Sequence, residues 1–113
     1  MGEGGSHGKE NMRLFPYIIA VDYDGTLFDQ LGNPNSKLIE RLIDHKNHGA
    51  RIILNTFREG DALQEAIDMC ANQGLEFNAI NENIPVIKRF FGEHRKIYAD
   101  VYIDDQAEIP EWE

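Results

Sequence analysis

The residues from Tyr17 to Val21, Y-I-I-A-V, form a continuous run of apolar residues that favour β-strands. A run without polar alternation is typical of a strand that is covered on both faces, as in a parallel sheet between layers of helices. Asp22 and Asp24 follow this run directly, so that two carboxylates stand where a buried strand ends. This combination constrains the fold more than any other feature of the chain.

Strand and helix patterns alternate along the rest of the chain. The turn and cap residues Asn33 to Ser36 predict the start of a helix that ends at Gly49. Arg51 to Thr56 predicts a second buried strand. The later elements are a helix to Gly74 that Asp61 and Gln64 open as a capping box, a short strand at Glu76 to Ile80, a short helix from Asn83 and Pro85 to Gly92, and a strand at Val101 to Ile103.

Strands that alternate with helices indicate right-handed crossovers and a parallel sheet. We therefore predict an α/β fold, a Rossmann-like three-layer sandwich around a central parallel sheet of about four strands. The 113 residues leave room for one domain, at residues 14–113. Residues 1–13 are rich in glycine and polar residues, and we interpret them as a flexible N-terminal arm or the remnant of a tag.

Composition limits the partners and the compartment. Twenty acidic against eleven basic residues give a formal net charge of −9, which disfavours nucleic acids and anionic membranes as partners. No apolar run is long enough to cross a bilayer. Cys70 stands alone and cannot form an internal disulfide, which fits a reducing compartment, and we interpret it as a core residue of a helix. We expect a soluble, cytoplasmic protein.

Polar side chains also follow the later strands. Thr56 ends the second predicted strand, and Asp104 and Asp105 follow the last one. Because ligands bind outside the carboxyl ends of parallel strands, we expect these residues to gather there with Asp22 and Asp24. Carboxylates that converge repel one another unless protons or a cation compensate. Hard oxygen ligands select Mg²⁺, which is commonly shared with a phosphate, so the pattern predicts a site for Mg²⁺ and a phosphorylated substrate.

Four motifs resemble those of the haloacid dehalogenase (HAD) superfamily, in the same order. They are D-Y-D-G-T after the first strand, the threonine of I-L-N-T, the lysine of H-R-K, and Y-I-D-D. The resemblance covers nearly the whole chain from Tyr17 to Asp105. It implies a HAD-like phosphatase that hydrolyses a small phosphomonoester with Mg²⁺ through an aspartyl-phosphate intermediate.

The resemblance also implies a role for each matching residue. Asp22 would be the nucleophile and a metal ligand, and Asp104 would complete the metal shell. Asp24 would protonate the leaving oxygen and then activate water, while its main-chain carbonyl touches the metal. Thr56 would donate its hydroxyl to a phosphate oxygen, and Lys96 would neutralise charge on the phosphoryl group.

Several assignments stay open. Gly25 would let the chain turn sharply beside the substrate. Arg58 either clamps a substrate anion or pairs with Glu59 on the surface. Asp105 is either a metal ligand or a supporting residue. A basic neighbour could fill the lysine role of Lys96; these neighbours are Lys88, Arg89 and Arg95. Phe90 and Phe91 are expected in the core rather than as a platform for the substrate.

The spacing of the motifs limits the size of any domain inserted between them. Residues 27–35 and 80–95 occupy the two gaps where many HAD members carry a cap, and neither gap is long enough for a domain. A capless member has an open site, and an unprotected sheet edge favours a homo-oligomer.

The alternative functions are a catalytically inactive HAD-like module that binds a phosphate or a protein, and a polynucleotide end-phosphatase, which the net charge disfavours.

Overall fold

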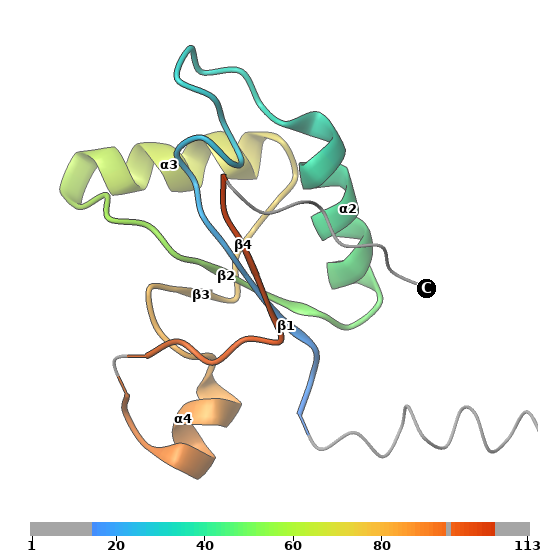
Figure 1. Ribbon diagram of the computed structural model, residues 1–113, viewed down its shortest axis with the longest axis vertical. Coiled ribbons are helices and arrows are strands. Elements are labelled where there is room, and N and C mark those ends of the chain that lie inside the picture. Colours follow the sequence, from blue (N-terminus) through green and yellow to red (C-terminus); the bar gives the residue numbers. More distant parts are fainter. Residues whose placement is uncertain (1–14, 95, 106–113) are drawn as a thin grey trace, which may run out of the picture.

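The computed structural model describes residues 15–94 and 96–105. Four parallel strands form one sheet in the order β3-β2-β1-β4 (Figure 1). The strands are β1 Ile18–Val21, β2 Arg51–Leu54, β3 Ala79–Ile80 and β4 Val101–Ile103. The prediction of a small Rossmann-like α/β fold around a parallel sheet is confirmed, and the predicted arm at residues 1–13 lies outside the described residues.

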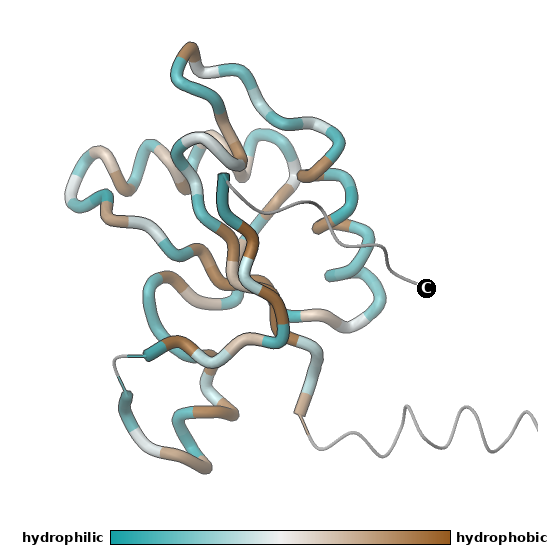
Figure 2. The backbone as a smooth tube through the Cα atoms, in the orientation of Figure 1, coloured by the Kyte–Doolittle hydropathy of each residue, from teal (hydrophilic) through white to brown (hydrophobic). Residues whose placement is uncertain are grey.

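The sheet lies between two helical layers. Successive residues of a strand point to opposite faces, and β1 therefore contributes to two cores. Ile19 and Val21 pack with α2 (Ser36–Asn47) and α3 (Gly60–Asn72), while Ile18 and Ala20 pack on the side of α4 (Pro85–Phe91). Figure 2 shows the hydrophobic strands at the centre of the molecule.

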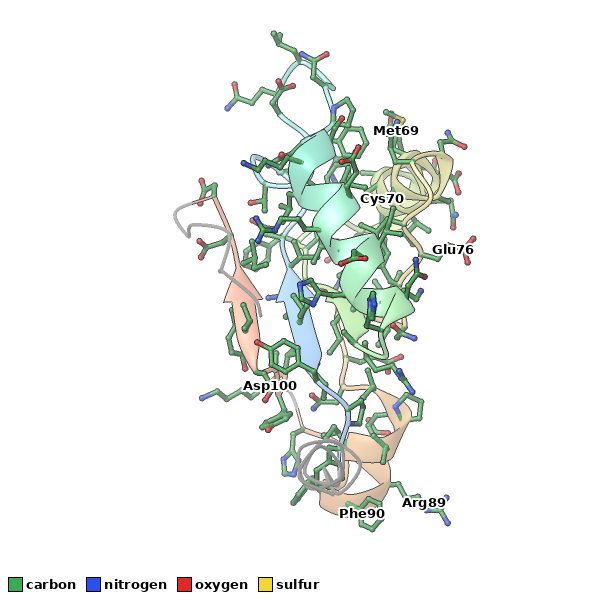
Figure 3. The ribbon with its side chains drawn as sticks, turned by 90° about the vertical axis from the view of Figure 1, so that its right-hand side faces the viewer. Met69, Cys70, Glu76, Arg89, Phe90 and Asp100 are labelled. Atoms are coloured by element: carbon green, nitrogen blue, oxygen red, sulfur yellow. The ribbon has the colours of Figure 1, made fainter. Side chains whose placement is uncertain are left out.

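Cys70 of α3 belongs to the larger core, as the sequence predicts. Its side chain is fully buried, and Figure 3 shows it on α3 beside α2. Burial raises the pKa of the thiol to about 12, so Cys70 stays protonated at neutral pH. Phe90 and Phe91 differ from their prediction, because 61% and 57% of these residues are exposed.

The capping box predicted at Asp61 and Gln64 is wrong. Helix α3 already begins at Gly60, and the N-cap residue Glu59 makes no side-chain cap hydrogen bond. The Gln64 side chain donates instead to Asp68, one turn further on, at 3.0 Å. Asp61 thus lies inside the first turn, where its charge complements the helix dipole.

Strands β2 and β3 are shorter than the sequence predicts because two asparagines bracket β3. The Asn78 side chain accepts the Ile52 N–H at 2.8 Å, and the Asn81 side chain accepts the Thr56 N–H at 2.8 Å. Side-chain oxygens thus replace main-chain acceptors at both ends of the β2 and β3 pair. Asn81 has a φ of 56°, a left-handed conformation in which asparagine is enriched.

The two gaps in which a cap would stand hold no second domain in the described part of the chain. The segment from Asp22 to Asn35 is a loop with isolated bridges, and the one after β3 carries only α4. Among the described helices, none has the length and apolar character needed to cross a membrane.

Asn35 connects the first helix to the loop after β1. Its Oδ1 accepts the Leu38 N–H at 3.2 Å, and its Nδ2 donates to the Thr26 carbonyl at 3.2 Å. We expect Asn35→Ala to lower the free energy of unfolding by about 1 kcal/mol, because an N-cap acceptor is lost. Urea denaturation measures this, with the exposed Lys37→Ala as control. Equal stability of the two variants would contradict a capping role.

Candidate active site

A cavity of about 290 Å³ opens at the carboxyl ends of β1, β2 and β4. It brings together Asp22, Thr56 and Asp104, which the sequence predicts from three separate motifs. Its other lining residues are Ala20, Val21, Asn55, Phe57, Tyr102 and Ile103. The parallel topology explains this meeting, because the carboxyl ends of neighbouring strands share one edge of the sheet.

Hydrogen bonds fix Asp22 at the end of β1. Its N–H donates to the Ile103 carbonyl at 3.0 Å, which ties the residue to the end of β4. Its Oδ1 accepts the Tyr23 N–H at 2.9 Å. One carboxylate oxygen is thus held by the main chain, and Oδ2 has no hydrogen bond to the residues that the structure describes.

The surroundings of Asp22 disfavour its charged form. Burial raises its pKa, and the hydrogen bond from Tyr23 opposes that shift in part. Three further carboxylates also raise the pKa; they are Asp24, Asp105 and Asp104. A cation near these groups would relieve the repulsion and restore the ionised form.

Thr56 is 9% exposed, and hydrogen bonds fix both its main-chain N–H and its hydroxyl oxygen. Its N–H donates to the Asn81 side chain at 2.8 Å, and its Oγ1 accepts the Arg58 N–H at 3.1 Å. Since a hydroxyl both donates and accepts, the Thr56 proton remains available for an oxygen in the cavity. The sequence does not predict that Asn81 accepts this bond, and its only signal is its place directly after the third strand.

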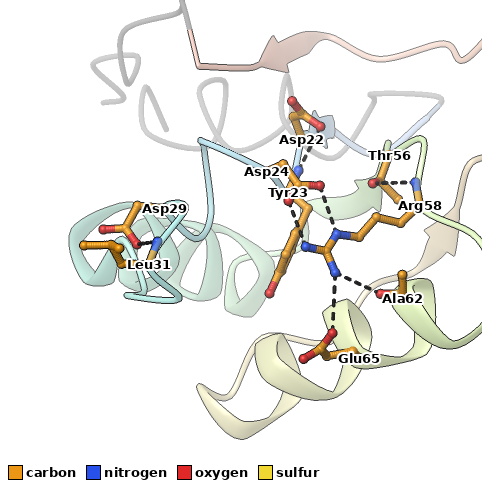
Figure 4. Close-up of polar contacts among 9 residues, drawn as sticks. All are labelled: Asp22, Tyr23, Asp24, Asp29, Leu31, Thr56, Arg58, Ala62 and Glu65. Carbon is orange, nitrogen blue, oxygen red and sulfur yellow. Dashed lines mark hydrogen bonds and ion pairs between the residues drawn. The ribbon is translucent and has the colours of Figure 1, made fainter.

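Arg58 donates two hydrogen bonds to Asp24 (Figure 4). Nε and Nη2 of the guanidinium donate to the two carboxylate oxygens, each at 2.9 Å, the bidentate geometry in which such pairs are strongest. Nη1 also donates to the Ala62 carbonyl at 3.1 Å and lies 3.7 Å from Glu65. The guanidinium lies 4.7 Å from the centre of the Tyr23 ring. The partner of Arg58 is thus Asp24, and pairing with Glu59 is not seen.

The hydrogen bonds from Arg58 determine the protonation state of Asp24. The hydrogen bonds from Arg58 lower the pKa of Asp24, so this carboxylate is ionised at neutral pH. The Asp24 side chain is 62% exposed and does not line the cavity that holds Asp22. In this arrangement Asp24 has no proton to donate, and Arg58 engages both of its oxygens until the pair separates.

Removing Arg58 is expected to release Asp24. In Arg58→Gln the pKa of Asp24 should rise toward the ordinary value, because the main cause of its depression is gone. The pair contributes stability above the unfolded pKa of Asp, and this contribution is lost as the pH falls through the depressed folded pKa. The partly exposed pair is worth about 1 kcal/mol or less at neutral pH. An NMR titration of the Asp24 carboxyl, with Arg89→Gln as control, measures the shift, and an unchanged titration would contradict the assignment.

Gly25 and Asp105 lie against each other. Gly25 has a φ of 80°, which favours glycine, and a Cβ at this position would lie 3.5 Å from the Asp105 Cβ. Asp105 thus packs on the turn after Asp22 and does not line the cavity.

The structure does not bring Lys96 to the cavity. Lys96 lines a second cavity, and its carbonyl accepts the Asn83 side chain at 3.1 Å. Lys88 pairs with Glu82 at 2.9 Å and with Glu93 at 3.7 Å, and Arg95 lies outside the described residues. Position therefore gives no support to the predicted role of Lys96 beside Asp22.

Metal donors near Asp22 are carboxylates. Within residues 15–94 and 96–105, no three His, Cys, Asp or Glu side chains converge closely enough to form a ready-made metal site. Two carboxylates, those of Asp22 and Asp104, face the same cavity.

Comparison of the chain with known protein families and with curated proteins gave no match. Among solved structures, it is similar to a conserved protein from Bacteroides thetaiotaomicron, with 36% sequence identity and a TM-score of 0.65. The alignment covers 87% of this chain and 84% of that protein. The chain therefore belongs to the same family as this conserved Bacteroides thetaiotaomicron protein.

Proposed function

We propose that the chain is a magnesium-dependent phosphomonoester hydrolase of the HAD type, with Asp22 as the nucleophile. The observation that carries this proposal is the meeting of Asp22, Thr56 and Asp104 in one cavity at the carboxyl ends of three strands. The order of the four motifs along the chain supports it.

The residues present suit Mg²⁺. Carboxylates are hard oxygen donors, and a divalent cation would offset both the burial and the neighbouring carboxylates that raise the pKa of Asp22. Proteins commonly hold Mg²⁺ through one or two carboxylates, waters and a substrate phosphate, so a group of three acidic side chains is not required. Asp22, Asp104 and the Asp24 carbonyl would hold it, and it would neutralise charge on the phosphoryl oxygens.

Asp22, Thr56 and Asp24 would each act in a separate part of the reaction. With Oδ1 of Asp22 held by Tyr23, Oδ2 would attack phosphorus and form an acyl phosphate while the bond to the leaving oxygen breaks, and the leaving group would depart as an anion that takes its proton from solvent. The Thr56 hydroxyl would donate to a phosphoryl oxygen. Once released by Arg58, the ionised Asp24 would take a proton from water, which then hydrolyses the acyl phosphate to Asp22 and inorganic phosphate.

Two observations favour a second candidate, a module that binds a phosphate or a protein without turnover. Arg58 holds Asp24 outside the cavity, and Lys96 lines another one. In each case, a residue to which the HAD resemblance assigns a catalytic role lies outside the cavity that holds Asp22. The polynucleotide end-phosphatase gains no such support, and the net charge of −9 still disfavours it.

A generic aryl phosphate separates the two candidates. We expect hydrolysis of 4-nitrophenyl phosphate in Mg²⁺ and its loss when EDTA removes the metal. A rise in melting temperature with Mg²⁺ but no turnover would favour the binding module. Absence of both effects would contradict both candidates.

A further inference from the structure

The second cavity is larger than the first and is dominated by aromatic residues. Its volume is about 610 Å³, which falls in the range of small-molecule sites. Its described lining includes two basic residues, Lys96 and His94, and the aromatic rings of Phe15, Phe91, Tyr98 and Tyr102.

The two cavities share the wall formed by Tyr102, which lines both. Tyr102 of β4 stands beside Ala20 of β1 in the sheet, and Ala20 packs on the α4 side. Ala20 is buried, whereas Tyr102 is half exposed and forms the surface of the sheet between the two cavities. A ligand in the first cavity can therefore continue over Tyr102 into the second.

Three of the rings that line the second cavity are partly exposed. Phe91, Tyr98 and Tyr102 are 57%, 48% and 50% exposed. Exposed aromatic faces favour stacking with a planar ring, and pairs of this kind contribute beyond the area they bury.

The charge of the second cavity contrasts with that of the chain. Among residues 15–94 and 96–105, no carboxylate side chain lines it, although the chain carries a net charge of −9. The Lys96 ammonium makes no ion pair or hydrogen bond with any residue in the described segments 15–94 and 96–105. An unpaired cation at a cavity free of acids is complementary to an anionic ligand group.

We propose, on the basis of the proposed function, that the substrate is a phosphomonoester of a planar aromatic compound that carries a second anionic group. The phosphoryl group lies at Asp22, the ring lies against Tyr102 and Tyr98, and the second anionic group meets Lys96. Lys96 is then a residue of substrate specificity rather than of catalysis.

Three esters test the proposal by steady-state kinetics: ethyl phosphate, 2-naphthyl phosphate and 6-carboxy-2-naphthyl phosphate. We expect KM to fall in that order. Lys96→Gln should raise KM for the carboxylated ester about 3- to 5-fold, as expected for one exposed charge pair, and reduce its advantage over 2-naphthyl phosphate. Tyr98→Ala should raise KM for both naphthyl esters about 5- to 10-fold. Lys37→Gln on α2, on the other side of the sheet, is the matched control.

A probe without phosphate tests the cavity apart from turnover. 6-Hydroxy-2-naphthoate should bind the wild-type protein in a fluorescence titration, and both variants should weaken it by the same factors. Three outcomes overturn the inference while the proposed function stands: equal KM values for the three esters, no binding of the probe, or an equal fall of kcat for all three esters in Lys96→Gln. Absence of turnover for all three esters overturns both proposals.

Discussion

Asp22→Asn is expected to lower kcat for 4-nitrophenyl phosphate by at least about 10³-fold in saturating Mg²⁺. The amide keeps the shape of the side chain and can still accept the Tyr23 N–H, but its nitrogen and neutral oxygen do not attack phosphorus as a carboxylate does. Initial rates of the purified wild type and variant measure the effect. The control is Asp44→Asn on α2, whose side chain is 72% exposed, and it should keep the wild-type rate within about twofold.

The residual activity of Asp22→Asn tests the assignment of Asp22 as the nucleophile. If Asp22→Asn kept more than about a tenth of the wild-type rate, another group or a co-purifying phosphatase would carry the turnover, and the assignment of the nucleophile would be wrong. A fall of the same size in Asp44→Asn would show that the loss does not depend on the position of the carboxylate.

The same variant separates the roles of Asp22 in catalysis and in metal binding. A carboxyl group whose folded pKa is raised lowers stability as the pH rises from its unfolded to its folded pKa, and the deficit persists at neutral pH. In EDTA, Asp22→Asn should therefore be more stable than the wild type. Mg²⁺ should raise the melting temperature of the wild type more than that of the variant, because ligands that bind the folded state stabilise it. Equal melting temperatures in EDTA would contradict an unfavourable burial of the Asp22 charge among other carboxylates.

Strand positions and their carboxyl ends could be predicted because they depend on patterns within a few residues. The apolar run before Asp22 and the one before Thr56 allow only buried strands, and alternation with helices makes the sheet parallel. The topology then brings the ends of β1, β2 and β4 together without any knowledge of side-chain contacts. The meeting of Asp22, Thr56 and Asp104 follows from these steps.

The partners of the charged side chains could not be predicted in this way. Asp24 and Arg58 are 34 residues apart, and their pairing depends on how two loops approach above the sheet. Nearness in sequence favoured Glu59 for Arg58, but the guanidinium lies over the Tyr23 ring and turns toward Asp24. Lys96 also follows no local pattern, because a loop before a strand can lead its side chain toward either end of the sheet.

The limits of the helices and strands were set by competition for hydrogen bonds. A capping box needs its acceptor outside the helix, and α3 begins two residues too early for Asp61 to serve. The β2 and β3 pair is short because Asn78 and Asn81 provide side-chain acceptors at its two ends. Sequence spacing alone does not tell whether an asparagine side chain or a main-chain carbonyl will accept such a bond.

Leu42→Ala is expected to lower the free energy of unfolding by about 3 kcal/mol, a large share of the roughly 5–10 kcal/mol typical of a domain of this size. Leu42 is fully buried on α2, in the core that this helix forms with α3 and β1, and truncation would leave a cavity there. Urea denaturation of the metal-free protein measures the change. The control Leu31→Ala removes a leucine that is 87% exposed and should change stability by less than about 0.5 kcal/mol.

The position of Leu42 also separates stability from catalysis. Its core lies on the α2 and α3 side of the sheet and contributes only Val21 and Ile103 to the lining of the first cavity, whereas Ala20 belongs to the core on the α4 side. Under conditions where the variant is folded, kcat per folded molecule should therefore match the wild type within about twofold. A stability loss below about 1 kcal/mol would show that the core refills the space, and a large loss of kcat in the folded variant would show that packing under β1 positions Asp22 through the sheet.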